Sequence, residues 1–184
     1  ITPCKVISYT PGEMQYSPLL AQIIIANPDG LIAVSHPQDA GIIMKQAAEM
    51  KIDLPRIGST SYCSQVSIDS AGKASDGWYS VGDWTNDIQS PKGKAFVEEY
   101  RKAYGHDPDF TGVYLYDSFL CLTEAIKIAN STEPEKVNEA LSKIKDVEGL
   151  VGKYSGDPNG VLGQTKFLTV NENGIGKLKD TITR

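Results

Sequence analysis

The stretch Gly30–Met50, GLIAVSHPQDAGIIMKQAAEM, contains the pattern that decides the fold. Its first part, Leu31–Val34, is a short apolar run of the kind found in strands that are buried on both faces of a sheet. Ser35 and His36 end this run, and Pro37 pre-sets the backbone angle for the first turn of a helix. The stretch therefore predicts a strand followed directly by a helix, with two polar side chains at the junction.

The segments around this stretch continue the same alternation. Lys5–Thr10 alternates and is rich in β-formers, which predicts a strand, and Ser17 is predicted to cap a helix that begins at Pro18. Pro55–Gly58 predicts a further short strand. Strands and helices that alternate over short connections indicate the α/β class, with a parallel sheet and helices on both of its faces.

The pattern changes after Gly105. From Thr111 to Asn130, apolar residues recur at helical spacing, and a second amphipathic helix follows. Near the end of the chain, Lys166–Val170 and Ile175–Lys179 flank the turn sequence Asn-Glu-Asn-Gly. This arrangement predicts a C-terminal β-hairpin.

Composition excludes several classes of protein. With 184 residues, 40% hydrophobic content and a net charge of −5, the chain has the composition of a globular domain and no basic stripe for nucleic acid. No apolar run approaches the roughly 20 residues of a membrane span, and no signal peptide is present, so we expect a mature, trimmed or fragmentary chain. Cys4, Cys63 and Cys121 are widely spaced and odd in number, which supports neither a disulfide framework nor a metal site.

An ordered series of stretches carries a resemblance that covers essentially the whole chain. It begins with YTPGEMQYSPLLAQIIIANPDGLIAVSHPQDAGIIMKQAAEMKIDLPRIGSTSY and DGWYSVGDW. It continues with FTGVYLYDSFLCLTEAIKIANSTEPEKVNEAL and VEGLVGKYSGDPNGVLGQTKFLTVNENG. In this order the stretches resemble the periplasmic type I solute-binding proteins of ABC transporters, and more narrowly their branched-chain amino acid (Leu/Ile/Val) binding group.

The resemblance implies a domain organisation. Residues 1–106 resemble the second lobe, incomplete at its start, residues 107–147 resemble helices that belong to the first lobe, and residues 148–184 return to the second lobe with the C-terminal strands. The family's chain is about twice as long, so this chain resembles its C-terminal half. We therefore expect exposed apolar sheet and helix surface, which the missing N-terminal half of the same protein would cover.

The resemblance also implies a function. We expect the protein to capture a small polar solute, such as an amino acid or organic acid, and to deliver it to an ABC permease. It would act in the periplasm or outside the cell, with lipid anchoring as an option, and without cofactor, metal or nucleic acid. The alternative is a ligand-sensing domain of a receptor or regulator with the same fold, which the sequence upstream would distinguish.

An enzyme is a third hypothesis. Cys63, His36 and either Asp39 or Asp69 could form a Cys-His-Asp set. The chain has no nucleophile elbow, no phosphate-binding glycine loop, no HExxH motif and no clustered metal ligands. We therefore expect no catalytic activity.

Two polar corners are the predicted ligand contacts in the second lobe. Ser35 and His36 precede a helix start that suits a carboxylate, although Ser35 could simply cap the helix and His36 could be a surface residue. The second corner contains Ser59 and Thr60. By resemblance this turn supplies a carboxylate for the ligand's ammonium group, but Thr60 is neutral and suits an acid, amide or alcohol head group. The alternative for this corner is a solvated Ser/Thr-rich turn.

Tyr116 and Asp117 are the remaining predicted contacts. By resemblance, this Tyr-Asp pair lies near the hinge, where the tyrosine stacks over the ligand and Asp117 could supply the missing negative charge. Tyrosine at helical spacing is more often part of a core, and an aspartate near a helix start is more often a cap. Both alternatives stay open at the level of sequence.

Overall fold

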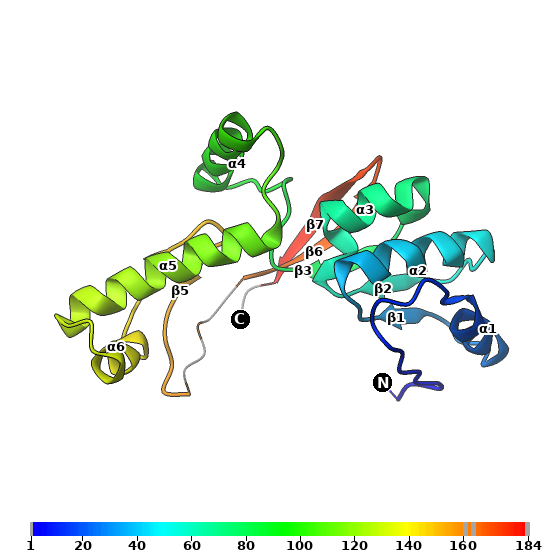
Figure 1. The fold of residues 1–184 in the computed structure, drawn as a ribbon, viewed down its shortest axis with the longest axis horizontal. Coiled ribbons are helices and arrows are strands. Elements are labelled where there is room, and N and C mark those ends of the chain that lie inside the picture. The colour runs from blue at the N-terminus through cyan, green and yellow to red at the C-terminus, as the bar shows by residue number, and fades with distance from the viewer. Residues whose placement is uncertain (1, 160–161, 163–164, 183–184) are drawn as a thin grey trace. The chain divides into compact units, whose positions relative to one another are not determined.

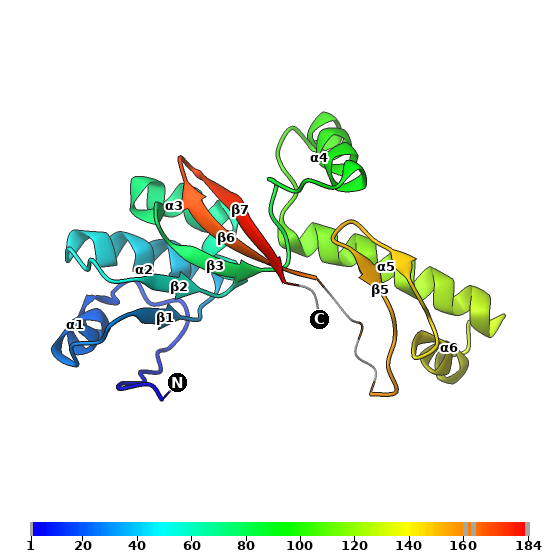
Figure 2. The same cartoon turned by 180° about the vertical axis from the view of Figure 1, so that it is seen from behind.

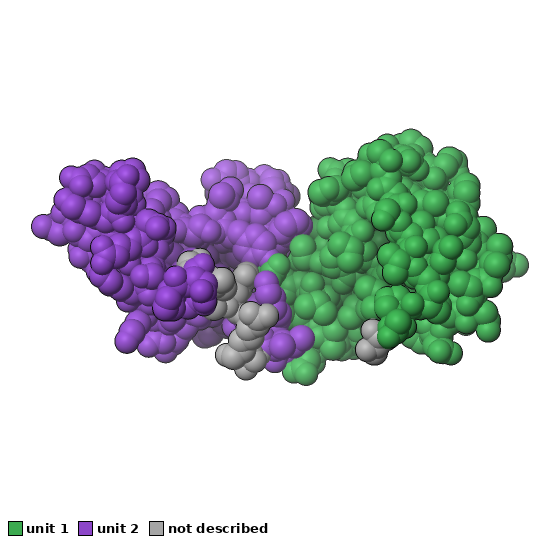
Figure 3. Space-filling model, turned by 90° about the horizontal axis from the view of Figure 1, so that it is seen from below, with its two compact units in different colours: residues 1–85, 167–180 green, residues 86–166, 181–184 purple. Residues whose placement is uncertain are grey.

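The computed structural model describes residues 2–159, 162 and 165–182 (Figure 1). The chain forms two compact units, which Figure 3 shows in green and purple. Unit 1 contains residues 1–85 and 167–180, and unit 2 contains residues 86–166 and 181–184. These boundaries differ from the expected changes of lobe after residues 106 and 147, and the assignment of segments to lobes stays a prediction.

Unit 1 is built on a five-stranded sheet with the strand order β1-β2-β3-β6-β7 (Figure 1). The first three strands are parallel, and β6 pairs with β3 in the antiparallel direction. Their bounds are Leu31–Ala33, Arg56–Gly58, Tyr79–Gly82, Lys166–Glu172 and Ile175–Ile182. The expected α/β class with a parallel sheet is confirmed.

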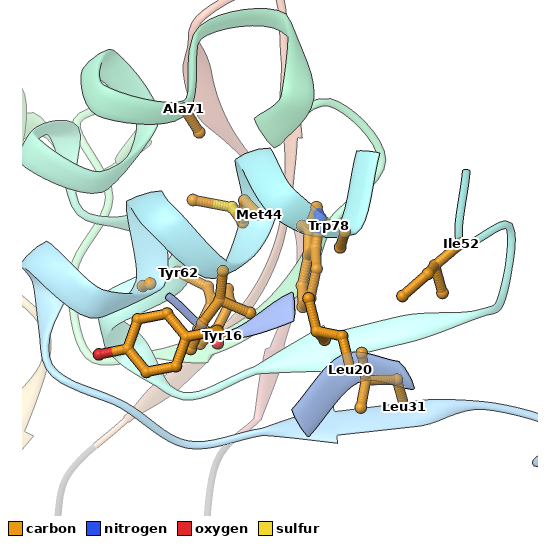
Figure 4. Close-up of a cluster of buried hydrophobic side chains, with 11 residues drawn as sticks. Tyr16, Leu20, Leu31, Met44, Ile52, Tyr62, Ala71 and Trp78 are labelled. Carbon is orange, nitrogen blue, oxygen red and sulfur yellow. The ribbon is translucent and has the colours of Figure 1, made fainter. Parts of the chain in front are cut away.

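Three α-helices follow the alternation that the sequence predicts. They are α1 Ser17–Ile25, α2 Pro37–Glu49 and α3 Gln65–Ala71, with the 3-10 turns η1 Thr60–Cys63 and η2 Gly72–Ser75. Their apolar side chains form a buried cluster with Leu31 of β1, in which Leu20 and Met44 meet Tyr62 and Trp78 (Figure 4). The rings of Tyr62 and Trp78 stack with centroids 4.8 Å apart. This cluster holds α1 and α2 on the Leu31 face of the sheet.

The start of α1 differs from the expectation. Tyr16, not Ser17, is the N-cap residue, and no side-chain cap hydrogen bond is made. The Ser17 hydroxyl donates instead to Oε1 of Gln46 on α2, at 3.1 Å, and the Tyr16 N–H donates to the same atom at 2.7 Å. The Ser17 hydroxyl, which was expected to cap α1, is therefore engaged in a hydrogen bond to α2 instead.

Lys5–Thr10 is not a strand, so that prediction is wrong. The segment has no partner strand in the described sheet, and a strand requires a neighbour for its backbone hydrogen bonds. Side chains secure the start of the chain instead. The buried carboxylate of Asp39 accepts hydrogen bonds from the Tyr16 hydroxyl at 2.8 Å and from the Gly12 N–H at 3.0 Å.

Unit 2 is mainly helical (Figure 2). It contains α4 Pro91–Tyr104, α5 Phe110–Ala129 and α6 Pro134–Leu141, with the short antiparallel pair β4 Val147–Glu148 and β5 Lys153–Tyr154. The Ser90 hydroxyl caps α4 by accepting from the Gly93 N–H at 3.1 Å, and Gly105 ends the helix with a φ of 75°. The long helix expected from Thr111 to Asn130 is confirmed.

The C-terminal hairpin is also confirmed. Strands β6 and β7 are neighbours in the sheet and are joined at Asn173 and Gly174, which have φ angles of 53° and 81°. Asn-Gly favours such a turn because both residues tolerate positive φ. No described helix is long and apolar enough to cross a membrane. The three cysteines are free thiols, with Cys4 exposed and Cys121 buried.

Candidate functional site

Two polar corners of unit 1 lie at the carboxyl edge of the sheet. β1 ends at Ala33 and β2 at Gly58, and these two residues are partners in the parallel register. The Ser59 N–H donates to the Ala33 carbonyl oxygen at 3.0 Å, so the loops that follow the strands run side by side. The structure thus brings the Ser35 corner and the Ser59 corner together.

The first corner opens α2. His36 is the N-cap residue, with an extended backbone and an exposed side chain that makes no cap hydrogen bond. The Ser35 carbonyl oxygen accepts from the Ser59 hydroxyl at 3.5 Å, which joins the two corners. The unpaired N–H groups and the positive dipole end of this 13-residue helix favour an anion beside His36.

The second corner leads into η1. The Ser59 carbonyl oxygen accepts from the Ser80 hydroxyl of β3 at 2.6 Å, and the Thr60 hydroxyl oxygen accepts from the Asp83 N–H at 3.4 Å. Thr60 therefore lies beside the end of the third parallel strand. Its hydroxyl proton is still available for a ligand, because only the oxygen is used in this contact.

The sequence analysis missed Asp83. This half-buried residue follows β3 directly, just as Ser35 lies shortly after β1 and Ser59 follows β2. The preceding Gly82 permits the close approach, since a Cβ there would lie 2.8 Å from the Cys63 sulfur and 3.3 Å from the Thr60 hydroxyl oxygen. The same rule that selected the other strand ends would have found this carboxylate, because the sequence Trp78–Val81 is itself typical of a strand.

We call the set of polar residues at this edge the edge cluster. It consists of Ser35, His36, Ser59, Thr60 and Asp83. Hydroxyls, an imidazole, a helix N-terminus and one carboxylate together can hold either an acidic head group or an ammonium group. The cluster is suited to binding, and it contains no activated nucleophile.

The geometry does not support the hypothesis of a catalytic Cys-His-Asp set. Asp39 is buried and its carboxylate accepts from Tyr16 and Gly12. Burial raises the pKa of the Cys63 thiol, which is the opposite of what an activated cysteine needs. Among the described residues, no group of three or more His, Cys, Asp or Glu side chains could hold a metal ion.

Tyr116 and Asp117 lie on α5 in unit 2. Tyr116 is 41% exposed and packs against Phe96 with ring centroids 5.3 Å apart. Tyr116 and Phe96 line a groove of about 480 Å³ together with Tyr100 and Leu150. The groove is an aromatic surface within unit 2, and a ligand role for Tyr116 stays a prediction.

Asp117 has an evident structural task. It is 1% exposed, and its carboxylate accepts from the Leu150 N–H at 2.8 Å and from the Tyr154 hydroxyl at 2.8 Å. The Val151 N–H adds a longer contact at 3.4 Å. The carboxylate thereby fixes the turn between β4 and β5 to α5. A direct ligand contact by Asp117 stays a prediction.

Comparison by sequence gives one family. A sequence model of the family described as "Periplasmic binding protein" matches residues 4–174. A Leu/Ile/Val-binding protein homolog of Brucella suis is 25% identical over 149 residues, which cover 81% of this chain and 40% of that protein. The chain thus spans less than half the length of this relative. The resemblance inferred from the sequence is confirmed.

Comparison by structure gives the same fold. A leucine binding protein from Thermotoga maritima superposes with a TM-score of 0.84 at 24% identity, over 94% of this chain and 49% of that one. A solute binding protein of an ABC transporter from R. palustris, solved with benzoate, superposes with a TM-score of 0.82 at 21% identity, over 94% of this chain and 48% of that one. At these identities the likeness shows the fold alone.

Proposed function

Because the chain belongs to the periplasmic binding protein family, we propose that its edge cluster binds a small polar solute, such as an amino acid or an organic acid. The observation that carries the proposal is that three adjacent parallel strands deliver the cluster to one edge of the sheet. In open α/β sheets, ligands bind outside the carboxyl ends of the strands.

The head group of the solute can be argued from the donors. A carboxylate would lie at the N-terminus of α2 beside His36, where the helix N–H groups are unpaired. An ammonium group, where the solute has one, would lie beside Asp83 and Thr60, because a desolvated ammonium needs a counter-charge. The names of the similar structures support this assignment, since leucine and benzoate both carry a carboxylate.

We further propose that the solute is handed to an ABC permease and that the protein acts in the periplasm or outside the cell. The family and the names of its members support this role. A solute-binding protein requires no reaction, and the family and the structural neighbours are solute-binding proteins rather than enzymes.

A complementary polypeptide region completes the protein in this proposal. Leu115 and Phe119 of α5 are 68% and 69% exposed, and Leu122 continues the same stripe one turn further. Apolar residues at this spacing form a docking face, because they lie on one side of a helix. The relatives are about twice as long as this chain, and the part of them that this chain does not match would supply the region that covers this face. We keep Tyr116, next to this stripe, as a proposed solute contact, with Asp117 holding its helix in place.

The test is an NMR titration of the ¹⁵N-labelled chain with leucine and, separately, with benzoate. We expect shifts at the amides of the edge cluster. His36→Ala should weaken both solutes, and Asp83→Asn should weaken leucine about tenfold while leaving benzoate unchanged, since a charged hydrogen bond contributes about 1.5 kcal/mol or more.

The control is His106→Ala. His106 is the other histidine of the chain, is exposed and lies in unit 2, so both affinities should stay as in the parent chain. Shifts spread over other parts of unit 1, or a His36→Ala variant that binds both solutes normally, would contradict the proposed site.

A further inference from the structure

The hydroxyl of Ser67 contacts the backbone of both polar corners. Ser67 lies in α3 and is 0% exposed. Its Oγ is 2.7 Å from the Pro37 carbonyl oxygen and 2.6 Å from the Ser61 carbonyl oxygen. Pro37 directly follows His36 of the first corner, and the second carbonyl belongs to the residue directly after Thr60. A side chain from outside the edge cluster thus lies behind two of its members.

The neighbouring Ser64 supplies a second hydroxyl hydrogen. Ser67 has only one, so it cannot donate fully to both carbonyls. Ser64 is the N-cap residue of α3, and its Oγ is 3.0 Å from the Ser61 carbonyl oxygen. Ser67 can therefore donate to the first corner, at Pro37, while Ser64 donates to the second. We call these two residues the serine pair, and together they tie both corners to the start of α3.

Burial strengthens these contacts. Ser64 is 6% exposed and Ser67 is 0% exposed, and hydrogen bonds are electrostatically stronger where water is excluded. Gly41 allows α2 to lie close to α3 at this place, since a Cβ there would be 2.7 Å from the Cβ of Ser70. The N-terminus of α2 and the start of η1 are therefore positioned from the same short helix.

The direct contact between the corners is longer than these. The Ser59 hydroxyl donates to the Ser35 carbonyl oxygen at 3.5 Å, which is near the limit for a hydrogen bond. The 3.0 Å bond from the Ser59 N–H to the Ala33 carbonyl lies at the strand ends, before the residues that would contact the solute. Beyond the strand ends, the serine pair provides the shorter link between the corners.

We infer that Ser67 is a positioning residue, which fixes the distance between the corners and thereby favours solutes that bind at both. The inference rests on the proposed function, in which a carboxylate lies beside His36 and an ammonium group lies beside Thr60 and Asp83. An α-amino acid has both groups, so it gains from corners that need not be ordered on binding. A solute with a carboxylate alone binds at one corner and does not depend on their distance.

The test is an NMR titration of the parent chain and of Ser67→Ala with leucine and, separately, with benzoate. Leucine has both groups and benzoate has the carboxylate alone. We expect Ser67→Ala to bind leucine at least about threefold more weakly, because the distance between the corners is no longer fixed before binding. The affinity for benzoate should stay as in the parent chain.

Ser64→Ala tests the hydrogen count. One hydroxyl hydrogen must then serve two carbonyl oxygens, so one corner is released. Leucine should again bind more weakly and benzoate should not. Ser64 also accepts from the Ser67 N–H at 3.3 Å, so the melting temperature of this variant is measured as well.

The double variant Ser67→Ala/Asp83→Asn separates positioning from general loosening of the fold. Asp83→Asn removes the counter-charge of the ammonium group, so leucine then depends on the first corner. Ser67→Ala should therefore cost little further affinity for leucine when Asp83→Asn is already present. Such non-additive losses are the signature of two residues that act on the same interaction.

Ser75→Ala is the matched control. Ser75 is also a serine of unit 1 with 0% exposure, and its hydroxyl donates to the Gly72 carbonyl oxygen at 2.8 Å. The substitution removes the same chemical group from an equally buried place away from the corners. It should leave both affinities as in the parent chain.

The other outcomes overturn the inference. If the parent chain binds both solutes but Ser67→Ala weakens them equally or not at all, Ser67 does not set the distance and the proposed function stands. Additive losses in the double variant, normal leucine binding by Ser64→Ala, or an equal loss in Ser75→Ala lead to the same conclusion. A parent chain that binds neither solute overturns the proposed function, and the inference with it.

Discussion

Asp39 shows how a single side chain substitutes for a missing sheet contact. It lies in the first turn of α2, yet its carboxylate is turned to the N-terminal segment, where Tyr16, Gly12 and, at 3.4 Å, Tyr9 donate to it. A buried charge needs such donors, because an unpaired one would cost several kcal/mol. The N-terminal segment is therefore fixed to α2 by the hydrogen bonds of Tyr9, Gly12 and Tyr16. Its strand-like residues Lys5–Thr10 have no partner strand in the described sheet.

Tyr16→Phe tests this anchor. The ring stays in the core while the 2.8 Å donor to Asp39 is lost, so the free energy of unfolding should fall by about 2 kcal/mol in urea denaturation. Tyr9→Phe removes the 3.4 Å donor and should cost less than half as much. Equal losses in the two variants would mean that hydrogen-bond geometry at Asp39 does not set the stability.

The difference in stability between Tyr16→Phe and the parent chain should depend on pH. Burial, and then the hydrogen bond to Asp39, raise the pKa of Tyr16, so the folded state keeps a proton that the unfolded state releases near its ordinary pKa of about 10. The stability is present below that pH and is lost as the pH rises above it. Between pH 8 and pH 11, the free energy of unfolding should therefore fall less for Tyr16→Phe than for the parent chain when both are measured over the same pH series.

At the level of elements, the alternation around Gly30–Met50 was enough to predict the parallel strands and α2. Lys5–Thr10 has an equally good local pattern, but a strand depends on a neighbour that can be far away in the sequence or outside it, and local composition cannot report that neighbour. Asp117 shows the same limit, because its donors at Leu150 and Tyr154 lie 33 and 37 residues later. Asp83, in contrast, could have been predicted from its position after β3.

The β6–β7 turn offers an element-level prediction. Gly174 has a φ of 81°, and no atom lies within 4 Å of the position that a Cβ would take there, so Gly174→Ala strains the backbone without a clash. The free energy of unfolding should fall by about 1 kcal/mol in urea. Asn173→Gly relieves a positive φ at the adjacent position and should change stability by only a few tenths of a kcal/mol. A neutral Gly174→Ala variant would contradict the turn geometry.

For the whole molecule, the division into two units has a measurable signature. Both tryptophans, Trp78 and Trp84, lie in unit 1, so tryptophan fluorescence reports that unit, whereas circular dichroism reports helices of both. The hydrogen-bond donors to Asp117, namely Leu150, Val151 and Tyr154, lie in unit 2. A change that appears in the circular dichroism transition but not in the fluorescence transition therefore belongs to unit 2.

Asp117→Asn should destabilise unit 2 alone. The amide cannot accept from the same set of N–H and O–H donors, so we expect a loss of about 3 kcal/mol in the circular dichroism transition and no shift of the fluorescence transition. Asp109→Asn on the same helix is the control, because asparagine caps a helix as well as aspartate does. A matching shift of the fluorescence transition would show that the units unfold as one.

The exposed thiol at Cys4 has a practical consequence. Cys121 is buried and Cys63 is partly covered, so a maleimide dye should attach first at the N-terminal segment, three residues before Ile7. An environment-sensitive fluorophore attached there would report, by a change in its emission, whether the complementary polypeptide region proposed above binds near the N-terminal segment. The protein thus carries a natural attachment point for an optical binding assay.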